Sequence, residues 1–449
     1  MPPDILNLPE YRALQVDDSG PDYHIRAEAI IPPAVCIHCG AASLVRYGHR
    51  EQLIHDLPIH GKRVGISIDT RRYRCKNCSK TFYEHLPAVD EKRRMTTRLV
   101  NWLGEQSTRK TFAQLAEEIG VSNMTVKAVF DDYSAKLGAV LRIATPEFMG
   151  IDEIHLIRRP RAVFTNTKGS DPAGGCLVIE MLSNRDKKTV VRYLSGLPDR
   201  ERILCVTIDM WRPYRDAVRE VLPDASVVVD KFHVLKMANA ALDHVRKSVG
   251  AVMTARQRRT LMKDRKLLLM RPKDLRPEAA FMLSGWLRNL PELEAAYHAK
   301  EAFYALYDAE SKEEALRLQR RWESGLATET KTAYQPLITA FHNWQEEILA
   351  YFDWGLTNAC AESANNLIRV ANRMGRGYSF EVLRSRILLT NHAGHKKKKP
   401  YVRPQPVERD NRYSLAVCEP SGSTEETIGE ISEGVDISTL LKIAEDGLL

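Results

Sequence analysis

Apolar and polar residues alternate in the first part of the chain with the period of a β-strand. In residues 63–75, Val64, Ile66 and Ile68 are separated by small or polar residues, and Tyr73 follows further along. Because successive side chains of a strand point to opposite faces, this spacing predicts a strand with one buried face. The chain is therefore expected to begin with β-structure.

A helical period replaces the alternation in TFAQLAEEIGVSNMTVKAVFDDY, residues 111–133. Gly120 separates two amphipathic runs, and Ser122 stands where the N-cap of the second run is expected. Two helices joined in this way are typical of a helix-turn-helix, whose second helix enters the major groove of DNA. A helical hairpin without a DNA-binding role is the alternative. On the first interpretation, the side chains at the DNA are Ser122, Asn123, Thr125 and Lys127.

From residue 146 the pattern becomes that of a sheet with helices. Four segments are predicted as strands: EFMGIDEIHLIRR, GGCLVIEML, TVVRYL and ILCVTID. The helical segment WRPYRDAVREVL follows, and ASVVVD predicts a further strand that runs into a helix. Three strands, then strand, helix, strand and helix, is the element order of a ribonuclease-H-like α/β domain. In such a sheet the first and fourth strands are neighbours, so we expect Asp152 and Asp209 to lie side by side.

Residues 240–350 lose the strand pattern and predict an all-helical insertion. Within it, the basic amphipathic stretch LMKDRKLLLMRPKDL could lie along DNA. Residues 358–374 predict one more helix. One face of that helix suits a metal ion at one end and DNA phosphates along the rest, because it carries Glu362, Asn365 or Asn366, Arg369 and Arg373 at spacings of three or four. The candidate DNA contacts on this face are Asn366, Arg369 and Arg373.

Cysteines occur as two C-x-x-C pairs and four single residues. The pairs are Cys36 with Cys39 and Cys75 with Cys78, and four thiolates on two tight turns suit a tetrahedral, structural Zn²⁺ site. The 35 residues between the pairs predict a zinc ribbon with an extended hairpin. Four free buried cysteines are the alternative. The scattered residues do not resemble a disulfide framework and favour a reducing, intracellular compartment; they are Cys176, Cys205, Cys360 and Cys418.

Charge changes the picture by pointing to a partner. The chain has 449 residues and a formal net charge of +8, and its last 27 residues are strongly acidic, so the body is more basic than the total indicates. Basic clusters favour a polyanion, with nucleic acid first, although solvated helix faces are the alternative for any one cluster. We find no apolar run of about 18 residues and no secretory signal, so we expect a cytoplasmic, nucleoid-associated protein that does not enter a membrane.

Three acids supply candidate chemistry. Phosphodiester cleavage can use two divalent cations, and Mg²⁺ prefers oxygen ligands and retains several waters. Asp152, Asp209 and Glu362 would supply such a set, with Mn²⁺ as a substitute for Mg²⁺. Each acid alone is equally well explained as a helix cap or a surface charge. The hypothesis therefore depends on all three occurring in this order of elements.

Across about residues 30–395 the chain resembles DDE-type insertion-sequence transposases of the ISL3 family. The matching stretches are GIDEI, VTIDMWRPYRDAV, VVVDKFHV and NACAESANNLIRVANRMGRGY. The resemblance implies that Asp152, Asp209 and Glu362 are the catalytic acids, and that Asp230 and His233 belong to a D-x-x-H motif of less certain role. Trp211, within the second stretch, is a further accessory candidate.

The predicted fold is a multidomain α/β protein, and its expected activity is cut-and-paste transposition. The segments are an N-terminal arm (1–30), a zinc ribbon (31–90), a helix-turn-helix domain (91–145), a ribonuclease-H-like catalytic domain in two parts (146–239 and 351–395), the helical insertion (240–350), and a linker with an acidic tail (396–449). The expected partners are the terminal inverted repeats, target DNA and further copies of the chain, in a homodimer or larger synaptic assembly.

Three other interpretations remain at this stage. A zinc-dependent helix-turn-helix regulator would bind DNA without cutting it. A ribonuclease-H-like nuclease would cut without joining strands. The third makes Cys360 a nucleophile, because it lies two residues before Glu362.

Overall fold

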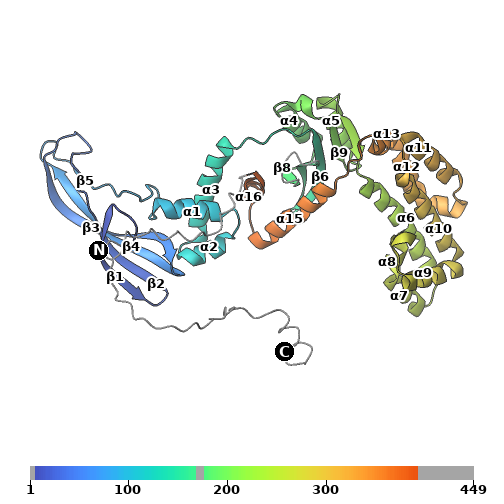
Figure 1. Cartoon of the computed structure of the whole chain (residues 1–449), viewed down its shortest axis with the longest axis horizontal. Coiled ribbons are helices and arrows are strands. Elements are labelled where there is room, and N and C mark those ends of the chain that lie inside the picture. The colour runs from blue at the N-terminus through green and yellow to red at the C-terminus, as the bar shows by residue number, and fades with distance from the viewer. Residues whose placement is uncertain (1–5, 168–175, 393–449) are drawn as a thin grey trace, which may run out of the picture. The chain divides into compact units, whose positions relative to one another are not determined.

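The computed structural model describes residues 6–167 and 176–392 (Figure 1). The linker and acidic tail predicted for residues 396–449 lie outside the described residues, as does Cys418. Within the described part, no helix is long and apolar enough to cross a membrane.

The N-terminal part is built around one five-stranded sheet. Its strands are β1 (Tyr11–Ser19), β2 (Asp22–Ala29), β3 (Leu44–Ile59), β4 (Lys62–Cys75) and β5 (Thr81–Tyr83). The order is β1-β2-β4-β3, and β5 pairs with β4. The alternation predicted in β4 is present, since Val64, Ile66 and Ile68 are buried in one core. Residues 11–29, assigned by sequence to an arm, instead form β1 and β2: β1 pairs with β2, and β2 pairs with β4 through residues 22–27, because Tyr23, Ile25, Ala27 and Ala29 contribute to that core.

Three helices follow the sheet and form the predicted helix-turn-helix. They are α1 (Thr97–Gln106), α2 (Phe112–Ile119) and α3 (Asn123–Val140). Gly120 ends α2 in the left-handed region with φ 79°, and the Ser122 side chain accepts a hydrogen bond from the Thr125 backbone N–H at the start of α3. Val126, Val129 and Phe130 of α3 are buried against α1 and α2.

The central part contains a second five-stranded sheet. Its strands are β6 (Phe148–Leu156), β7 (Arg159–Asn166), β8 (Leu177–Met181), β9 (Cys205–Ile208) and β10 (Ser226–Val229). The order is β10-β9-β6-β7-β8. β6 is parallel to β9, and β9 is parallel to β10, whereas β7 and β8 continue the sheet in antiparallel pairs. The first and fourth strands are thus neighbours, as predicted.

One strand prediction in this sheet was wrong, and one strand was missed. TVVRYL is not a strand but lies in helix α4 (Lys187–Ser195), capped by Asp186 and buried through Val190 and Leu194, four residues apart. β7 was missed, because the hairpin between β6 and β7 turns at Ile157 and Arg158, both with positive φ. Neither residue type signals such a turn, which usually contains Gly or Asn.

Helices form a continuous segment between β10 and residue 354. They comprise α6 (Lys231–Ala251), α7 (Ala255–Lys263), α8 (Arg265–Leu269), α9 (Pro277–Asn289), α10 (Pro291–Ala305), α11 (Lys312–Ser324), α12 (Thr328–Asn343), α13 (Gln345–Leu349) and α14 (Tyr351–Trp354). α5 (Arg212–Val221) joins β9 to β10. One apolar core runs from the sheet through α4, α5 and α6 into these helices.

The opposite face of the central sheet is covered by α15 (Ala359–Gly375) and α16 (Phe380–His392). Ile154 and Leu156 of β6 pack there against Ile368 of α15 and Leu383 of α16. α16 also reaches the helix-turn-helix, whose core includes Val382 and Leu389. Arg386 strengthens this junction, because its guanidinium donates hydrogen bonds to the carbonyl oxygens of Ser107 (2.7 Å) and Lys110 (2.8 Å).

Candidate active site

Three neighbouring strands of the central sheet bring candidate metal ligands together. Asp152 lies in β6, Asp209 follows β9, and His233 lies in the first turn of α6, just after β10. One ligand atom from each of these side chains lies within 4.8 Å of the other two. The pairing of Ile151 with Ile208 in the parallel ladder explains why the two aspartates meet.

Burial raises the pKa of both aspartates and so makes them weaker acids than usual. Removal from water raises the pKa of Asp152 to about 6, and the nearby Asp230 carboxylate adds to the rise. Burial likewise raises the pKa of Asp209 to about 6, and the charge of Asp152 contributes. The Oδ1 atom of Asp209 is enclosed without a hydrogen-bond partner among the described residues. Two such carboxylates, one with an unused oxygen, fit a divalent cation.

His233 is the third side chain of this site, and the acids around it favour its protonated form. Its Nδ1 atom lies 3.5 Å from Oδ2 of Asp230, and this carboxylate raises the pKa of the imidazole. The His233 charge in turn lowers the pKa of both Asp152 and Asp209. A carboxylate beside a histidine also fixes the ring orientation, which is how metal-binding histidines are commonly held. Asp230 is therefore the carboxylate placed beside the His233 ring, at 3.5 Å.

Glu362 stands apart from this group. It lies in the first turn of α15, is exposed, and is not among the side chains whose ligand atoms meet within 4.8 Å. It is close enough for its charge to contribute to the raised pKa of Asp152. The described structure thus joins Asp152 and Asp209 with His233, and places Glu362 at the edge of the site.

Two asparagines hold the site together: Asn358, which the sequence analysis did not single out, and Asn365, which it named only as an alternative to Asn366. Asn358, which precedes α15, is buried: its side chain bonds to Thr207 Oγ1 (2.8 Å) and the Ile151 carbonyl (3.2 Å), and its backbone N–H donates to Asp230. It fits because Gly150 leaves space; a Cβ there would lie 2.7 Å from Asn358 Oδ1. Asn365 donates to Oδ2 of Asp152 at 2.8 Å.

We expect Asn365→Ala to lower the rate of metal-dependent cleavage about ten- to a hundredfold, since this amide orients a candidate metal ligand. Cleavage would be measured at saturating DNA over a range of Mg²⁺ concentrations. The control is Ser363→Ala, because Ser363 is exposed in the same helix, two residues before Asn365. Equal rates for the Asn365 variant and the control would contradict the positioning role.

The site opens into a pocket of about 350 Å³. Its lining includes Asp209, Trp211, His233 and Lys236. Trp211, the accessory candidate, is partly exposed, and the Arg185 guanidinium lies 4.1 Å from the centre of its ring. Arg185 also pairs with Glu153, next to Asp152. A cation and an aromatic ring at the mouth of an acidic site suit a nucleic-acid strand.

The four paired cysteines form a second candidate metal site. Their sulfur atoms lie within 4.8 Å of one another, with 3.7 Å between Cys36 and Cys78 and 3.7 Å between Cys39 and Cys75. A tetrahedral zinc site with Zn–S bonds of about 2.3 Å requires sulfurs about 3.8 Å apart. The long hairpin of β3 and β4 separates the two pairs, as predicted.

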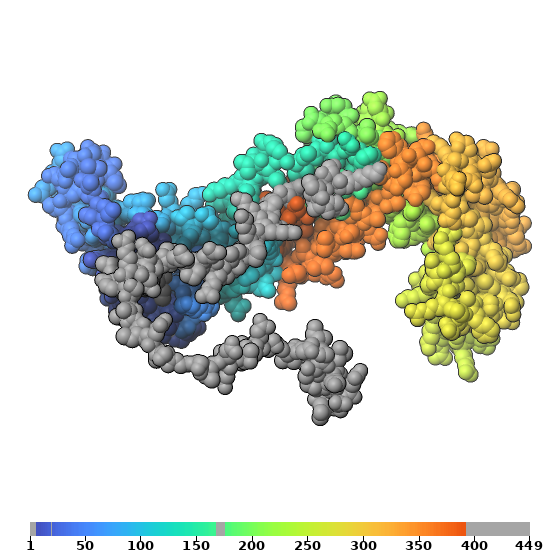
Figure 2. All heavy atoms as spheres, in the orientation of Figure 1, coloured from blue at the N-terminus to red at the C-terminus, as the bar shows by residue number. Residues whose placement is uncertain are grey.

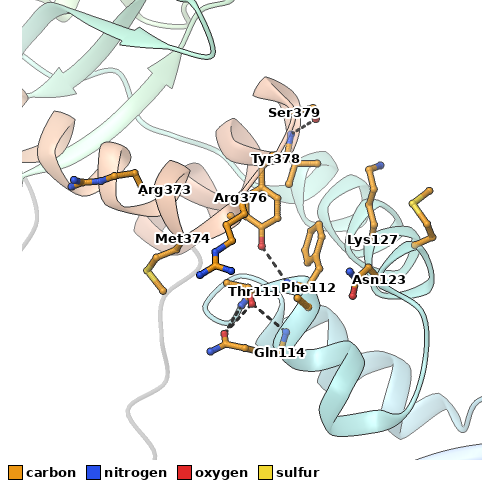
Figure 3. A pocket seen from close by; sticks show the side chains of 15 residues that line it. Thr111, Phe112, Gln114, Asn123, Lys127, Arg373, Met374, Arg376, Tyr378 and Ser379 are labelled. Carbon is orange, nitrogen blue, oxygen red and sulfur yellow. Dashed lines mark hydrogen bonds between the residues drawn. The ribbon is translucent and has the colours of Figure 1, made fainter.

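The candidate DNA contacts of α3 and α15 meet at one pocket of about 910 Å³ (Figure 3). Asn123 and Lys127 line it from α3, and Arg373 and Arg376 from the end of α15. Tyr378 fixes the junction, because its hydroxyl accepts a hydrogen bond from the Phe112 backbone N–H at 3.2 Å. Ser122 and Thr125 lie nearby at the start of α3. The candidate residues of α15 are all exposed: Glu362, Asn366, Arg369 and Arg373.

A further basic surface, without individual assignments from sequence, lies near the cysteine site. Arginine and tyrosine side chains from β3, β4 and β5 alternate there. Arg50 stacks over Tyr83 (4.0 Å), Arg72 lies between Tyr83 and Tyr47 (5.7 and 5.6 Å), and Arg74 lies over Tyr47 (5.7 Å). None of the three arginines forms an ion pair within the described residues. Such stacking holds guanidinium groups in place for phosphate contacts.

One cysteine prediction was wrong. Cys176 and Cys360, treated as single residues, form a disulfide. They are 184 residues apart in the sequence, so nothing local marks them as a pair. The disulfide joins the start of β8 to the first turn of α15.

Comparison with protein families decides which interpretation applies. The family model described as the transposase of the ISL3 family matches residues 149–387, more than half of the chain. The chain belongs to the ISL3 family of transposases. In this transposase, residues 32–78 also match the zinc finger of the IS204/IS1001/IS1096/IS1165 transposases, and residues 84–134 match the helix-turn-helix domain of the ISL3 family.

Curated relatives agree. The transposase is 26% identical over 375 residues to the transposase for insertion sequence element IS1001 of Bordetella parapertussis, covering 81% of this chain and 89% of the relative. It is also 26% identical over 284 residues to the transposase for insertion sequence element IS1557 of Mycobacterium tuberculosis, covering 58% of this chain and 63% of that relative. The zinc-ribbon match and the four-cysteine geometry together support a structural Zn²⁺.

Proposed function

We propose that this transposase excises and inserts DNA with a divalent-cation site formed by Asp152, Asp209 and His233, with Glu362 completing it when DNA is bound. The observation that carries the proposal is the meeting of Asp152, Asp209 and His233 within 4.8 Å on three neighbouring strands. Strand order β10-β9-β6-β7-β8, with parallel central strands, supports a ribonuclease-H-like fold for this sheet. The domain boundaries given from sequence for residues 31–392 are part of the same proposal, with β1 and β2 added to the first sheet.

The donor set fits Mg²⁺ or Mn²⁺, because it offers two hard carboxylates with an unused oxygen. When bound, a pair of such ions supplies Lewis-acid stabilisation of the charge that develops on the reacting phosphate. The chain's own residues do the rest. Asp152 and Asp209 hold the cations, Asn365 orients Asp152, and Asp230 orients His233. Arg369 and Arg373 contact phosphates and keep the strand along α15.

The basic surfaces bind the ends of the element, and the metal site then cuts them and joins them to target DNA. Asn123 and Lys127 of α3, with the arginine-tyrosine surface of β3–β5, contact the terminal inverted repeat, while Ser122 and Thr125 fix the start of α3. Water is the first nucleophile, and the freed 3′-hydroxyl attacks target DNA at the same site. Two ends must be joined to one target, so the active assembly is at least a homodimer.

The test uses the purified full chain and a plasmid that carries the inverted repeats flanking its gene. We expect cuts at the element ends that require Mg²⁺ or Mn²⁺, and joined products when target DNA is added. Cuts without joined products would identify a nuclease. Tight binding to the ends without cuts under any divalent cation would identify a regulator.

The disulfide leaves Cys360 without the free thiol that a nucleophile requires. The Cys360 sulfur is bonded to Cys176, and the proposed chemistry needs no protein nucleophile. We expect Cys360→Ser to cleave DNA at a rate within about threefold of that of the unmodified chain. The comparison is made under reducing conditions, so that neither protein contains the disulfide. A loss of about a thousandfold, with DNA binding unchanged, would restore the cysteine interpretation.

A further inference from the structure

The helical part carries a strongly basic segment that the proposed function does not use. Residues 252–276 contain nine Lys and Arg residues and two Asp residues. One of the acids, Asp264, already accepts a hydrogen bond from the Trp286 indole N–H at 2.8 Å. The segment forms α7 and α8, and Figure 2 shows it in yellow-green at the molecular surface.

Six cations of α7 and α8 are exposed, and we call them together the α7–α8 surface. They are Arg256, Arg258, Arg259, Lys263, Arg265 and Lys266. None forms an ion pair within the described residues; Arg258 and Arg259 donate only to backbone carbonyls of Met253 and Ala255. By contrast, nearby Arg271 pairs with Asp308 and Lys312 with Asp353. Cations without acidic partners are available to a polyanion.

The backbone beneath the α7–α8 surface is held firmly. Thr254 and Gln257 form a capping box at the start of α7, and Leu261 and Leu268 are buried in the core. The buried ammonium group of Lys300 donates to the carbonyl oxygens of Leu268 (2.8 Å) and Met270 (3.1 Å). A surface that is already ordered loses little conformational entropy when it binds.

A single helix fixes the position of this surface relative to the candidate metal site. α6 begins beside Asp230 and His233 and ends at Ala251, three residues before the N-cap of α7 (Figure 1). At 1.5 Å per residue, its 21 residues span about 31 Å. In duplex DNA, at about 3.4 Å per base pair, this length corresponds to roughly nine base pairs.

We propose that the α7–α8 surface binds the phosphate backbone of duplex DNA roughly nine base pairs from the scissile phosphate. The distance rests on the proposed function, whereas the binding itself does not. Regularly spaced guanidinium and ammonium groups suit phosphates, and Arg256, Arg259 and Lys263 recur on one face of α7 at spacings of three and four. A membrane surface fits less well, because the exposed large apolar side chains of residues 252–276 do not line one helix face: Val252 precedes α7, Met262 lies in it and Met270 follows α8.

The first test compares the unmodified chain with a full-length triple variant, which combines Arg256→Gln, Arg259→Gln and Lys263→Gln. Glutamine retains helix propensity, and circular dichroism would verify the fold. Binding to a 30-base-pair duplex of arbitrary sequence would be measured without divalent cations between 50 and 200 mM KCl. We expect binding about tenfold or more weaker at 100 mM, and a slope of log affinity against log salt that is smaller by about 2.7.

The matched control is a second triple variant, in which three exposed cations of α11 are replaced: Arg317→Gln, Arg320→Gln and Arg321→Gln. An unchanged slope in the α7 variant, or an equal fall in the control, would overturn the proposal. So would loss of binding to anionic phosphatidylserine vesicles with DNA binding intact, which would identify a membrane surface.

The second test measures the distance. Duplexes that extend 5, 10 or 15 base pairs beyond the cleavage site on either side would be compared for binding by the unmodified chain and the α7 variant. We expect the two proteins to bind equally to the shortest duplex and to differ once it passes about nine base pairs. A difference in binding to arbitrary DNA without any cleavage would reject the proposed function and keep the α7–α8 surface.

Discussion

Asp209→Asn is expected to abolish strand cleavage and, at the same time, to stabilise the metal-free protein. Cleavage should fall by about a thousandfold or more, because a metal ligand contributes several kcal/mol to the transition state. Binding to the inverted repeats should remain, since the helix-turn-helix and the arginine-tyrosine surface lie on other elements. Cleavage of the repeat-carrying plasmid and gel-shift assays of end binding would measure the two effects.

The stability gain follows from the acidity of the buried carboxyl group. The folded protein raises the pKa of Asp209 from 3.8 to about 6, so the folded state resists ionisation. Below pH 3.8 the carboxyl group is neutral in both the folded and the unfolded state, so it does not lower the free energy of unfolding. As the pH rises through 6, the folded state loses the neutral form and must bury a charge. At pH 8 the cost is about 3 kcal/mol or less, because the site relaxes and water enters. Asparagine removes that cost.

We therefore expect the thermal transition of the catalytic part to rise by about 5 °C at pH 8 without divalent cations, and to change little at pH 4.5. Mg²⁺ should raise the transition of the unmodified chain and leave that of the variant nearly unchanged. Asp224→Asn is the control, since this acid is exposed in the loop before β10. A variant that cuts DNA at the normal rate would remove Asp209 from the site.

Cys75→Ser is expected to remove zinc and to unfold the open end of the β3–β4 hairpin, where β3 begins and β4 finishes. Structural zinc contributes about 10–16 kcal/mol in isolated zinc-finger peptides, and Cys75 is fully buried beside Tyr73 and Phe82. This small cluster contains little apolar surface besides those two rings, so the metal is its main source of stability. Binding to the inverted repeats should weaken at least about tenfold, because Arg72 and Arg74 leave their places over the tyrosines.

The effect should remain local. The core formed by Ile25, Val64 and Ile66 lies in a separate cluster of the same sheet and does not depend on the cysteines. Zinc content by mass spectrometry and amide hydrogen exchange of residues 36–52 and 70–83 would locate the loss. Lys76→Ala tests a neighbouring exposed residue of the same turn and should keep about one zinc ion per chain. A serine variant with full zinc content would exclude the four-cysteine site.

Sequence patterns predicted the parts whose signals are local. The helix-turn-helix was predictable because Gly120 and Ser122 mark the end of one helix and the start of the next. TVVRYL was misassigned because six residues with two adjacent valines fit a strand as well as a helix, and only packing of Val190 and Leu194 decides between them. The β6–β7 hairpin was missed because Ile157 and Arg158 adopt positive φ under tertiary constraint.

The candidate site was predictable to a similar extent. Asp152 and Asp209 followed from the expected order of strands, and the parallel pairing of β6 with β9 brings them together. The contacts of Asn358 and Asn365 could not be predicted, because they join residues more than 200 positions apart, as in the bonds to Ile151 and Asp152. Gly150 was the one available signal, since a glycine within a strand often marks a close approach of other groups.

The attachment of α16 to the helix-turn-helix affects the order in which the protein matures on the ribosome. Phe112 is covered by Tyr378, with ring centres 4.8 Å apart, and Arg386 bonds to the carbonyl of Ser107, which is synthesised 279 residues earlier. At usual rates of translation, roughly a quarter of a minute to one minute separates the two residues. The contacts that fasten the helix-turn-helix to α16 therefore form only after the catalytic part has been synthesised.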